Sequence, residues 1–315
     1  MSGIWDNLQL AKFNVLPQKV RLSLGEGNTP IKLFEHPGGP IIAIKDENLN
    51  PNGSFKDRSV AYQMSMHVEN GVRSFVISSS GNAGIAALAY GKLAGVAVRV
   101  YVGENVNPKK MAKMAALLGG DKNTISKDSP ELKLEVLQTA QPKSDAFKFA
   151  QESGRLNLRG SNDDFAIAGF KTIAYELAEQ YPKMDAVFVP CSSGTSAYAI
   201  CLAFEEMGMK IPVYICQTQN VCPIASEFDP QTRIADASIA DAIVDRVANR
   251  KPQLLEKLVS CGGGGFVIGN AELQETADKI APYGFGFSYN SLLGFAGLLR
   301  NSVNCKHPVV IASGL

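Results

Sequence analysis

The sequence lacks the features that mark nucleic-acid-binding and membrane proteins. Its net charge is only +1, from 31 basic and 30 acidic residues, so a clustered basic surface for a phosphate backbone is not expected. It has no apolar run of about 18 residues, which a membrane-spanning helix needs. Its first residues also lack the basic start and apolar core of a secretory signal. We therefore expect a cytoplasmic protein that binds neither nucleic acid nor a membrane.

Histidines and closely paired cysteines are also scarce. The chain has three histidines and six cysteines, and no two cysteines form a C-x-x-C pair. Structural zinc sites are built from such clusters, so no metal site is expected. Most of the cysteines stand in apolar segments such as 199–202 and 214–216. This placement is typical of buried, reduced thiols in a reducing compartment.

The length and the apolar content indicate two folded domains. The chain has 315 residues, 45% of them hydrophobic, which excludes intrinsic disorder. Short β-branched segments alternate with longer segments of helical periodicity. We predict strands at 41–45, 74–78, 96–102, 186–189, 213–216 and 308–312. We predict helices at 57–70, 83–94, 108–118, 166–180, 196–207, 270–281 and 291–301.

The repeated order of strand and helix predicts an α/β fold with mostly parallel sheets. The polar stretch 121–159 is not assigned, and the glycines at 262–265 are expected to form a loop or to stop a helix. Ligands of parallel sheets bind at the carboxyl ends of the strands. The turns that follow the predicted strands are therefore the places to look for a site.

The first such turn places a lysine at the start of a helix. Residues 51–59 read PNGSFKDRS, and Lys56 falls in the first turn of the predicted helix. Because that helix end carries partial positive charge, a lysine there does not favour stability. An amine held neutral beside cationic groups is a good nucleophile for a carbonyl. The alternative is an ordinary surface turn in which Lys56 is solvated and Asp57 caps the helix.

Two further turns are rich in small and hydroxyl residues. Residues 78–84 read SSSGNAG, and Asn82 offers both a donor and an acceptor. Residues 189–196 read VPCSSGTS, a composition that suits a phosphate held by backbone amides and hydroxyls. This third turn is neither GxxxxGK[ST] nor GxGxxG, which disfavours a nucleotide ligand. Each turn taken alone is also compatible with a plain connection between strand and helix.

The three turns together match the needs of a phosphorylated aldehyde cofactor. Pyridoxal phosphate forms an imine with a lysine, and its phosphate group binds at a helix N-terminus. The lysine turn, the asparagine turn and the phosphate turn supply these groups. The sequence therefore predicts a pyridoxal-phosphate site.

The amino-acid sequences of four segments resemble those of a known family. The segments are 24–31 (LGEGNTPI), 45–58 (KDENLNPNGSFKDR), 79–84 (SSGNAG) and 169–177 (GFKTIAYEL). In order and wording they resemble the tryptophan-synthase-β-like, or fold type II, pyridoxal-phosphate enzymes, and most of all the threonine-synthase branch. The resemblance extends over residues 24 to 315. It implies two doubly wound, mostly parallel-sheet α/β domains with the cofactor in the cleft. The expected large domain is 1–45 with 155–315, and the expected smaller domain is 46–154.

The resemblance also implies roles for individual residues around the cofactor. Lys56 would bind the cofactor covalently and shuttle protons, Asn82 would hydrogen-bond its 3′-oxygen, and Ser313 would face its pyridine nitrogen. Phe55 would border the cofactor. The cofactor phosphate would be held by Cys191, Ser192, Ser193, Gly194 and Thr195.

The implied substrate is a small amino acid that carries a phosphate. Its binding residues would be Ser79, Ser80, Gly81, Asn82 and Ala83. The family commonly has an arginine for the substrate phosphate shortly before the 169–177 segment, but residues 166–169 read AIAG. Arg159, which stands earlier in the chain, and Ser161 are the polar candidates for that role.

The implied reaction converts O-phosphohomoserine and water into threonine and phosphate, in a homodimer. Three alternatives stay open. They are β-elimination from threonine or serine, β-replacement as in cysteine synthases, and cofactor binding without catalysis.

Overall fold

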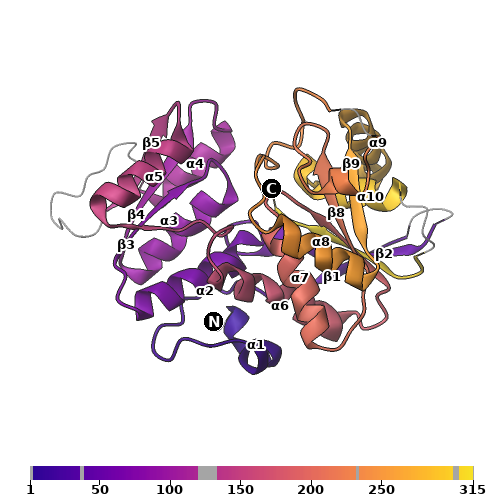
Figure 1. Ribbon diagram of the computed structural model, residues 1–315, viewed down its shortest axis with the longest axis horizontal. Coiled ribbons are helices and arrows are strands. Elements are labelled where there is room, and N and C mark those ends of the chain that lie inside the picture. Colours follow the sequence, from indigo (N-terminus) through magenta and orange to yellow (C-terminus); the bar gives the residue numbers. More distant parts are fainter. Residues whose placement is uncertain (1–2, 36–38, 120–132, 232–233, 301–304, 315) are drawn as a thin grey trace. The chain divides into compact units, whose positions relative to one another are not determined.

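The computed structural model describes residues 3–35, 39–119, 133–231, 234–300 and 305–314 (Figure 1). The chain divides into two compact units, each with one sheet. Unit 1 consists of Met1–Glu26 and Lys56–Gly169, and unit 2 consists of Gly27–Phe55 and Phe170–Leu315. No helix in the described part of the chain is both long and apolar enough to cross a lipid bilayer.

Unit 1 is built on a four-stranded parallel sheet in the order β5-β4-β3-β6. Its strands are β3 (Ser74–Ser78), β4 (Ala97–Gly103), β5 (Leu134–Thr139) and β6 (Leu156–Asn157). Its helices and short 3-10 turn are η1 (Gly3–Asp6), α1 (Leu8–Phe13), α2 (Lys56–Glu69), α3 (Asn82–Ala94), α4 (Pro108–Leu117) and α5 (Pro142–Ser153). The middle of β3 is buried, because α3 and α5 pack against this sheet.

Unit 2 is built on a six-stranded sheet in the order β1-β2-β10-β7-β8-β9. Its strands are β1 (Ile31–Glu35), β2 (Ile41–Asp46), β7 (Ala186–Pro190), β8 (Val213–Thr218), β9 (Gly264–Ile268) and β10 (Pro308–Ala312). Only β1 runs antiparallel to its neighbour.

The helices of unit 2 follow its strands. They are α7 (Thr195–Glu206), α8 (Lys251–Cys261), α9 (Asn270–Ile280) and α10 (Tyr289–Arg300), with the short turns η2 (Glu47–Leu49), η3 (Ala225–Glu227) and η4 (Ala281–Tyr283). A further helix, α6 (Phe165–Gln180), begins in unit 1 and continues into unit 2 after Gly169.

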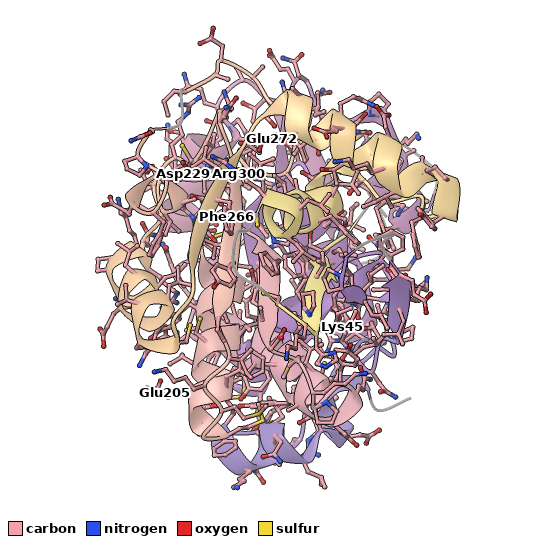
Figure 2. The ribbon with its side chains drawn as sticks, turned by 90° about the vertical axis from the view of Figure 1, so that its right-hand side faces the viewer. Lys45, Glu205, Asp229, Phe266, Glu272 and Arg300 are labelled. Atoms are coloured by element: carbon pink, nitrogen blue, oxygen red, sulfur yellow. The ribbon has the colours of Figure 1, made fainter. Side chains whose placement is uncertain are left out.

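One edge of the sheet in unit 2 is fixed by aromatic packing and by an arginine (Figure 2). Phe266 of β9 lies 5.8 Å from the ring of Tyr214 on β8, centroid to centroid. Arg300, the last residue of α10, donates to the carbonyl of Val267 over 2.7 Å and pairs with Asp229 over 3.0 Å. These contacts hold α10 on the sheet, so β8 and β9 form a rigid support for the loops at their ends.

The α/β class and the mostly parallel sheets are confirmed. All six predicted strands and all seven predicted helices are present, with ends shifted by at most two residues. The prediction missed β1, β5, β6 and β9, together with α1, α5 and α8. The unassigned stretch 121–159 contains β5, α5 and β6, and its first part lies outside the described residues.

The prediction for residues 262–265 was correct only in part. Gly262 ends α8 with a positive φ of 78°, as a helix stop should. Gly264 and Gly265, however, begin β9. A Cβ on Gly263 would lie 2.0 Å from the carbonyl oxygen of Val213, so glycine permits the strand to approach β8 here. The glycines at 262–265 predict a loop or a helix stop, but Gly263 instead allows a strand to pack closely on its neighbour.

The boundaries of the two units differ from the expected domains in three segments. Residues 1–26 belong to unit 1, where Trp5 stacks on Tyr62 at 5.5 Å. Residues 155–169 also belong to unit 1, because β6 pairs with β3. Residues 46–55 belong to unit 2, where Ser54 forms a bridge with Gly314.

Candidate active site

Lys56 is the first residue of α2, and the first turn of this helix is tightly packed. Lys56 itself is half-buried, whereas Asp57 and Arg58 are fully buried. A Cβ on Gly169 would lie 2.3 Å from the carbonyl oxygen of Arg58 and 2.7 Å from the Cα of Ser59. Only glycine allows this approach, so Gly169 fixes the position of the helix end that carries Lys56.

The buried carboxylate of Glu26 anchors residues 24–26, the last residues before the first unit boundary, to helix α3. Tyr90 donates a hydrogen bond of 2.6 Å to Glu26, whose carboxylate also accepts the backbone N–H of Leu24 over 2.9 Å. Burial, together with the nearby charges of Glu26 and Asp57, raises the pKa of Tyr90. The phenol therefore stays a proton donor, and it anchors the 24–26 part of the glycine-rich N-terminal motif.

The asparagine turn lies at the carboxyl end of β3. Ser79 donates its backbone N–H to Tyr101 over 3.0 Å, and the hydroxyl of Ser80 accepts the N–H of Gly103 over 3.0 Å. A Cβ on Gly81 would find no atom within 4 Å, so space is open above the turn. Asn82 begins α3. This arrangement leaves the N-terminus of α3 accessible to an anion such as a carboxylate.

Arg159 and Ser161 follow β6, which lies directly beside β3 in the sheet. The strand order reverses at this point, because the chain runs from β3 to β4 and β5 and then returns to the other side of β3. Ligands of open α/β sheets bind at such reversals, outside the carboxyl ends of the strands. Arg159 is exposed and Ser161 is half-buried. The fold therefore places a cation and a hydroxyl at the same sheet edge as the asparagine turn.

Unit 2 has a second reversal of strand order, between β7 and β10. The chain runs from β7 to β8 and β9, and β10 returns to the other side of β7. The segments after these two strands are Cys191–Gly194 and Ser313. Phe55 also reaches this edge, because its backbone N–H donates to the carbonyl oxygen of Ser313 over 3.1 Å. The predicted cofactor residues of unit 2 thus follow β7 or β10 at one reversal, or, in the case of Phe55, bind to it through the backbone.

In the turn after β7, the first two side chains have structural roles. The thiol of Cys191 is fully buried. The hydroxyl of Ser192 donates to Asp245 over 3.1 Å and accepts the backbone N–H groups of Val244 and Asp245, each over 3.2 Å. These two side chains therefore serve the fold, although their backbone groups still belong to the turn.

The rest of the turn has the form of an anion site. The hydroxyls of Ser193 and Thr195 lie 3.2 Å apart at the start of α7. Gly194 has a φ of 89°, and a Cβ there would lie 2.9 Å from Leu254. Glycine is thus required for both conformation and packing. Backbone N–H groups and two hydroxyls at a helix N-terminus are the donors that a phosphate group needs.

Two serines that the sequence analysis did not assign support the end of β10. Ser288 and Ser291 both donate hydrogen bonds to the carbonyl oxygen of Gly314, over 2.6 and 2.9 Å. They hold the residue that follows Ser313. The only signal in the sequence is the pair of serines in segment 288–291, and their role becomes visible only once β10 is placed.

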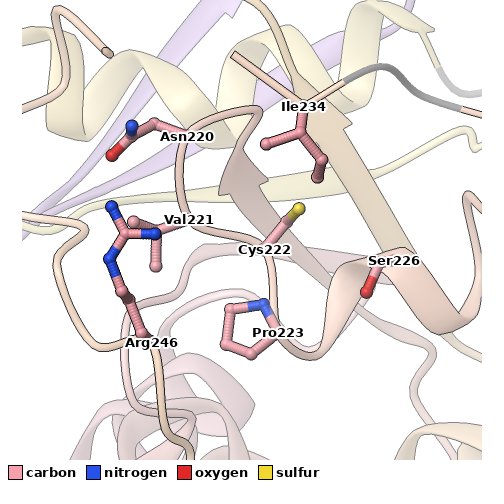
Figure 3. A pocket seen from close by; sticks show the side chains of 7 residues that line it. All are labelled: Asn220, Val221, Cys222, Pro223, Ser226, Ile234 and Arg246. Carbon is pink, nitrogen blue, oxygen red and sulfur yellow. The ribbon is translucent and has the colours of Figure 1, made fainter. Parts of the chain in front are cut away.

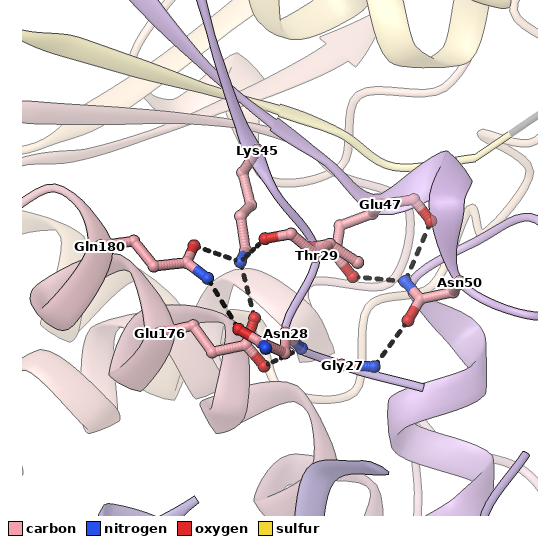
Figure 4. Close-up of polar contacts among 8 residues, drawn as sticks. All are labelled: Gly27, Asn28, Thr29, Lys45, Glu47, Asn50, Glu176 and Gln180. Carbon is pink, nitrogen blue, oxygen red and sulfur yellow. Dashed lines mark hydrogen bonds and ion pairs between the residues drawn. The ribbon is translucent and has the colours of Figure 1, made fainter. Parts of the chain in front are cut away.

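The segment 45–50, which precedes the lysine turn, is part of a buried polar scaffold within unit 2 (Figure 4). Lys45 is fully buried and donates to Glu176 over 2.6 Å, to the carbonyl of Thr29 over 2.7 Å and to Gln180 over 2.8 Å. Glu47 accepts from Thr29 over 2.6 Å and from Asn50 over 2.8 Å. This network joins the N-terminal motif to the segment that leads to Phe55.

A cavity of about 250 Å³ lies beyond the carboxyl end of β8 (Figure 3). It is lined by Asn220, Val221, Cys222, Pro223, Ser226, Ile234 and Arg246. The amide of Asn220 donates to the carbonyls of Ala235 and Asp236, and so shapes its wall. The cavity borders the segment that Ser192 anchors, since Arg246 follows Asp245 in the chain.

The donor set fits pyridoxal phosphate within each unit. Unit 1 supplies a lysine amine and an open asparagine turn, and unit 2 supplies a helix N-terminus with two hydroxyls and a serine at the end of β10. Among the residues that the structure describes, no cluster of three or more His, Cys, Asp or Glu side chains is arranged to hold a metal ion.

Comparison with known proteins places the chain in a family. A threonine synthase of Halalkalibacterium halodurans is 26% identical over 292 residues, which cover 90% of this chain and 75% of that protein. A serine racemase of Arabidopsis thaliana is 26% identical over 212 residues, 67% of this chain and 59% of that protein. The solved structure of the processed threonine deaminase isoform 2 of Solanum lycopersicum aligns with a TM-score of 0.75 at 18% identity, over 91% of this chain and 83% of that chain.

The family model described as "Pyridoxal-phosphate dependent enzyme" matches residues 22–314. This match covers nearly the whole chain, and the α/β architecture agrees with that of the fold type II members. The chain belongs to the pyridoxal-phosphate-dependent enzymes of fold type II.

Proposed function

We propose that the protein converts O-phosphohomoserine and water into threonine and phosphate. The similarity to a threonine synthase over 90% of the chain supports this reaction. Pyridoxal phosphate supplies an electron sink that makes the proton on the α-carbon of a bound amino acid acidic. The protein supplies the groups that hold the cofactor, hold the substrate and move protons.

Lys56 would hold the cofactor through its amine and then act as general base and acid. Its place in the first turn of α2 supports this role, because the positive helix end favours the neutral amine that a nucleophile and a base require. The amine would take a proton first from the α-carbon and then from the β-carbon of the substrate, so that phosphate can leave the γ-carbon. Protons would then return to the γ-carbon and, after hydroxide from water has added at the β-carbon, to the α-carbon, while the remaining proton of that water leaves with the phosphate.

The turn after β7 would hold the cofactor phosphate with its backbone N–H groups and the hydroxyls of Ser193 and Thr195. Ser313 would face the pyridine nitrogen and Asn82 the 3′-oxygen. A hydroxyl rather than a carboxylate beside the pyridine nitrogen does not favour its protonation. The asparagine turn, Ser79 to Ala83, would bind the substrate carboxylate at the N-terminus of α3.

The observation that carries the choice of a phosphorylated substrate is the position of Arg159. Arg159 and Ser161 follow β6, and the asparagine turn follows its neighbour β3. A substrate whose carboxylate binds the turn would thus have a cation and a hydroxyl available for a second anion. An arginine pairs well with phosphate because its planar guanidinium donates two hydrogen bonds at once.

The experiment is an assay of the purified protein with pyridoxal phosphate and O-phosphohomoserine, in which phosphate and threonine are both measured. We expect the two products in equal amounts, and none from Lys56→Ala. Phosphate without threonine would show that the elimination occurs but the hydration does not. Neither product, from protein that binds the cofactor normally, would overturn the proposal.

A second candidate is a reaction on serine or threonine, namely β-elimination or racemisation. The similarity to a serine racemase over 67% of the chain favours it. These substrates carry no phosphate, so Arg159 would have no role. Formation of 2-oxo acid or D-serine from wild type, unchanged in Arg159→Gln, would decide for this candidate. β-Replacement and binding without catalysis remain the further alternatives that the same panel of substrates separates.

We also propose that the enzyme works as a homodimer in the cytoplasm. Exposed apolar side chains in the N-terminal segment of unit 1, Leu8 at 84% and Val15 at 75%, support a second copy as a partner. Sedimentation or light scattering should give twice the chain mass of 33.7 kDa. A mass of one chain at all concentrations would contradict the dimer.

A further inference from the structure

Gln217 is a fully buried amide near the end of β8, the strand that pairs with β7. Every residue of β8 is buried, so this side chain places a polar group in the interior of unit 2. A buried amide costs free energy unless its donor and its acceptor are both hydrogen-bonded. Gln217 meets this requirement through three hydrogen bonds to backbone groups, and these bonds show what the side chain holds.

The donor end of the amide holds the turn that follows β7. The Nε2 atom of Gln217 donates to the carbonyl oxygen of Ser192 over 3.1 Å. The preceding residue of β8, Cys216, accepts the backbone N–H of Cys191 over 2.9 Å through its own carbonyl. Two consecutive residues of β8 therefore fix two consecutive residues of the turn.

The bond to the carbonyl of Ser192 also sets the direction of the next N–H group. The peptide that joins Ser192 to Ser193 is trans, and a planar trans peptide directs its C=O and its N–H to opposite sides. Because the carbonyl points toward Gln217, the N–H of Ser193 points to the other side of the turn. In the part of the chain that the structure describes, the N–H groups of Ser193 and Gly194 have no hydrogen-bond acceptor. They are therefore available to an anion.

The acceptor end of the amide supports the same turn from below. The Oε1 atom of Gln217 accepts the backbone N–H groups of Ile224 and Ala225, over 2.9 and 2.8 Å. Ile224 is fully buried, and a Cβ on Gly194 would lie 3.0 Å from its Cδ1 atom. A carboxylate has only acceptors, so glutamate could not replace both functions of this amide.

We propose that Gln217 is a positioning residue for the phosphate group of the cofactor. Its amide orients the peptide between Ser192 and Ser193 and holds Ile224 against Gly194. The inference rests on the proposed role of the turn after β7 as the phosphate site. Gln217 acts through the N–H of Ser193 and does not itself contact the phosphate. A donor that is already oriented needs no rearrangement when the anion binds, so more of its hydrogen-bond energy appears as affinity.

The test compares pyridoxal phosphate with pyridoxal, which has the same ring and aldehyde but no phosphate. Absorbance titrations give the Kd of both compounds for wild type, Gln217→Glu and the uncharged Gln217→Met. We expect wild type to prefer pyridoxal phosphate. In both variants the Kd of pyridoxal phosphate should rise by about 10–100-fold, the effect of losing a hydrogen bond to a charged group. The Kd of pyridoxal should stay within about twofold of its wild-type value.

The control variant is Gln219→Glu, which makes the same change two residues later, where the side chain lies against Gly269. It should leave both values of Kd unchanged. A second measurement uses wild type alone and does not depend on how any variant folds. Hydrogen exchange at the backbone amide of Ser193 should slow when pyridoxal phosphate binds, and it should not slow when pyridoxal binds.

Three results would overturn the role of Gln217 and leave the cofactor assignment in place. They are an undiminished preference for pyridoxal phosphate in both Gln217 variants, an equal rise in Kd for the two compounds, and the same exchange at Ser193 with either compound. A different result tests the proposed site itself. If wild type binds pyridoxal and pyridoxal phosphate equally well, the turn after β7 is not a phosphate site, and the inference falls with it.

Discussion

Lys45 is a buried cation, and its hydrogen bonds to Thr29, Glu176 and Gln180 determine what its replacement does. Lys45→Met removes the charge and leaves Glu176 buried at the same place, so we expect the free energy of unfolding to fall by about 3–5 kcal/mol. Urea unfolding followed by circular dichroism measures this change. The control is Lys148→Met, whose exposed pair with Glu152 spans 3.8 Å and should change stability by less than about 0.5 kcal/mol. Equal losses in the two variants would refute the scaffold role of Lys45.

Arg159 tests the proposed substrate at the level of one side chain. A charged hydrogen bond contributes about 1.5–3 kcal/mol, so Arg159→Gln should raise KM for O-phosphohomoserine by about 10–100-fold. Cofactor binding should not change, because the cofactor residues are intact. Steady-state kinetics and a cofactor titration measure the two effects.

The control for Arg159 is Arg73→Gln, which makes the same change of charge. Arg73 directly precedes β3, so it lies at the amino end of the strand whose carboxyl end carries the asparagine turn. Its guanidinium donates to the carbonyls of Val68 and Val72. Its KM should stay within about twofold of wild type, on the order of 0.4 kcal/mol. If Arg159→Gln behaves in the same way, Arg159 does not contact the substrate.

The residues of the candidate site were predictable because each stands in a short, continuous motif. Lys56, Asn82 and Gly194 are recognisable from their neighbours in the chain, and the structure places each at a helix start. The sequence did not predict that, within the turn after β7, the hydroxyl of Ser192 has a structural role whereas those of Ser193 and Thr195 lie at the helix start. That structural role depends on Asp245 and the backbone around it, which approach Ser192 from a distant part of the chain.

Among the elements, α2 depends on a glycine of α6. In Gly169→Ala the new methyl group would meet the carbonyl of Arg58, so either α2 or α6 must move. We expect a loss of about 1–3 kcal/mol in stability and weaker cofactor binding, because the displaced turn carries Lys56. Thermal unfolding and a cofactor titration measure both. Gly286→Ala, at a position with no atom within 4 Å of the new Cβ, should leave both unchanged. A tolerated Gly169→Ala would contradict this account of α2.

A charged contact joins α2 to the segment before α6, and it makes stability depend on pH. Burial raises the pKa of Asp163, but hydrogen bonds from His67 and Gln63 outweigh it, so the net pKa is lowered from 3.8. A carboxylate with a lowered pKa in the folded state stabilises the protein above its unfolded pKa. This stabilisation is lost as the pH falls through the folded pKa.

The corresponding variant is Asp163→Asn, which keeps the hydrogen bond to the backbone of Phe165 and loses the charge. We expect it to be less stable than wild type by about 1–3 kcal/mol at about pH 5, with a smaller difference at about pH 3. Urea unfolding at the two pH values measures it. The exposed carboxylate Glu152 provides the control variant Glu152→Gln, for which little difference is expected at either pH. A difference for Asp163→Asn that grows toward low pH would have the wrong sign.

The strands β1 and β6, which the sequence analysis missed, were missed for related physical reasons. β1 (IKLFE) is largely exposed and mixes apolar with charged residues, so its alternation of apolar and polar residues is weak. β6 has only two residues, and it is a strand because β3 lies beside it. Both are defined by their neighbours rather than by their own composition, in contrast to the buried strands β7 and β8.

At the scale of the whole molecule, the chain crosses from one unit to the other three times, after Glu26, Phe55 and Gly169. Each crossing lies within a motif that the sequence analysis treated as one segment, so composition could not locate it. The position of each crossing is determined by contacts with residues far away in the sequence. Tyr90 holds Glu26 in unit 1, and Ser313 holds Phe55 in unit 2.

The central claim is that this enzyme holds pyridoxal phosphate through Lys56. Reduction of the holoprotein with borohydride fixes the cofactor to the lysine that binds it, and peptide mapping then identifies that residue. We predict that the cofactor mass is found on the peptide containing Lys56, and on no peptide of the Lys56→Ala variant. Cofactor mass on another lysine, such as Lys171, or on none, would contradict the account.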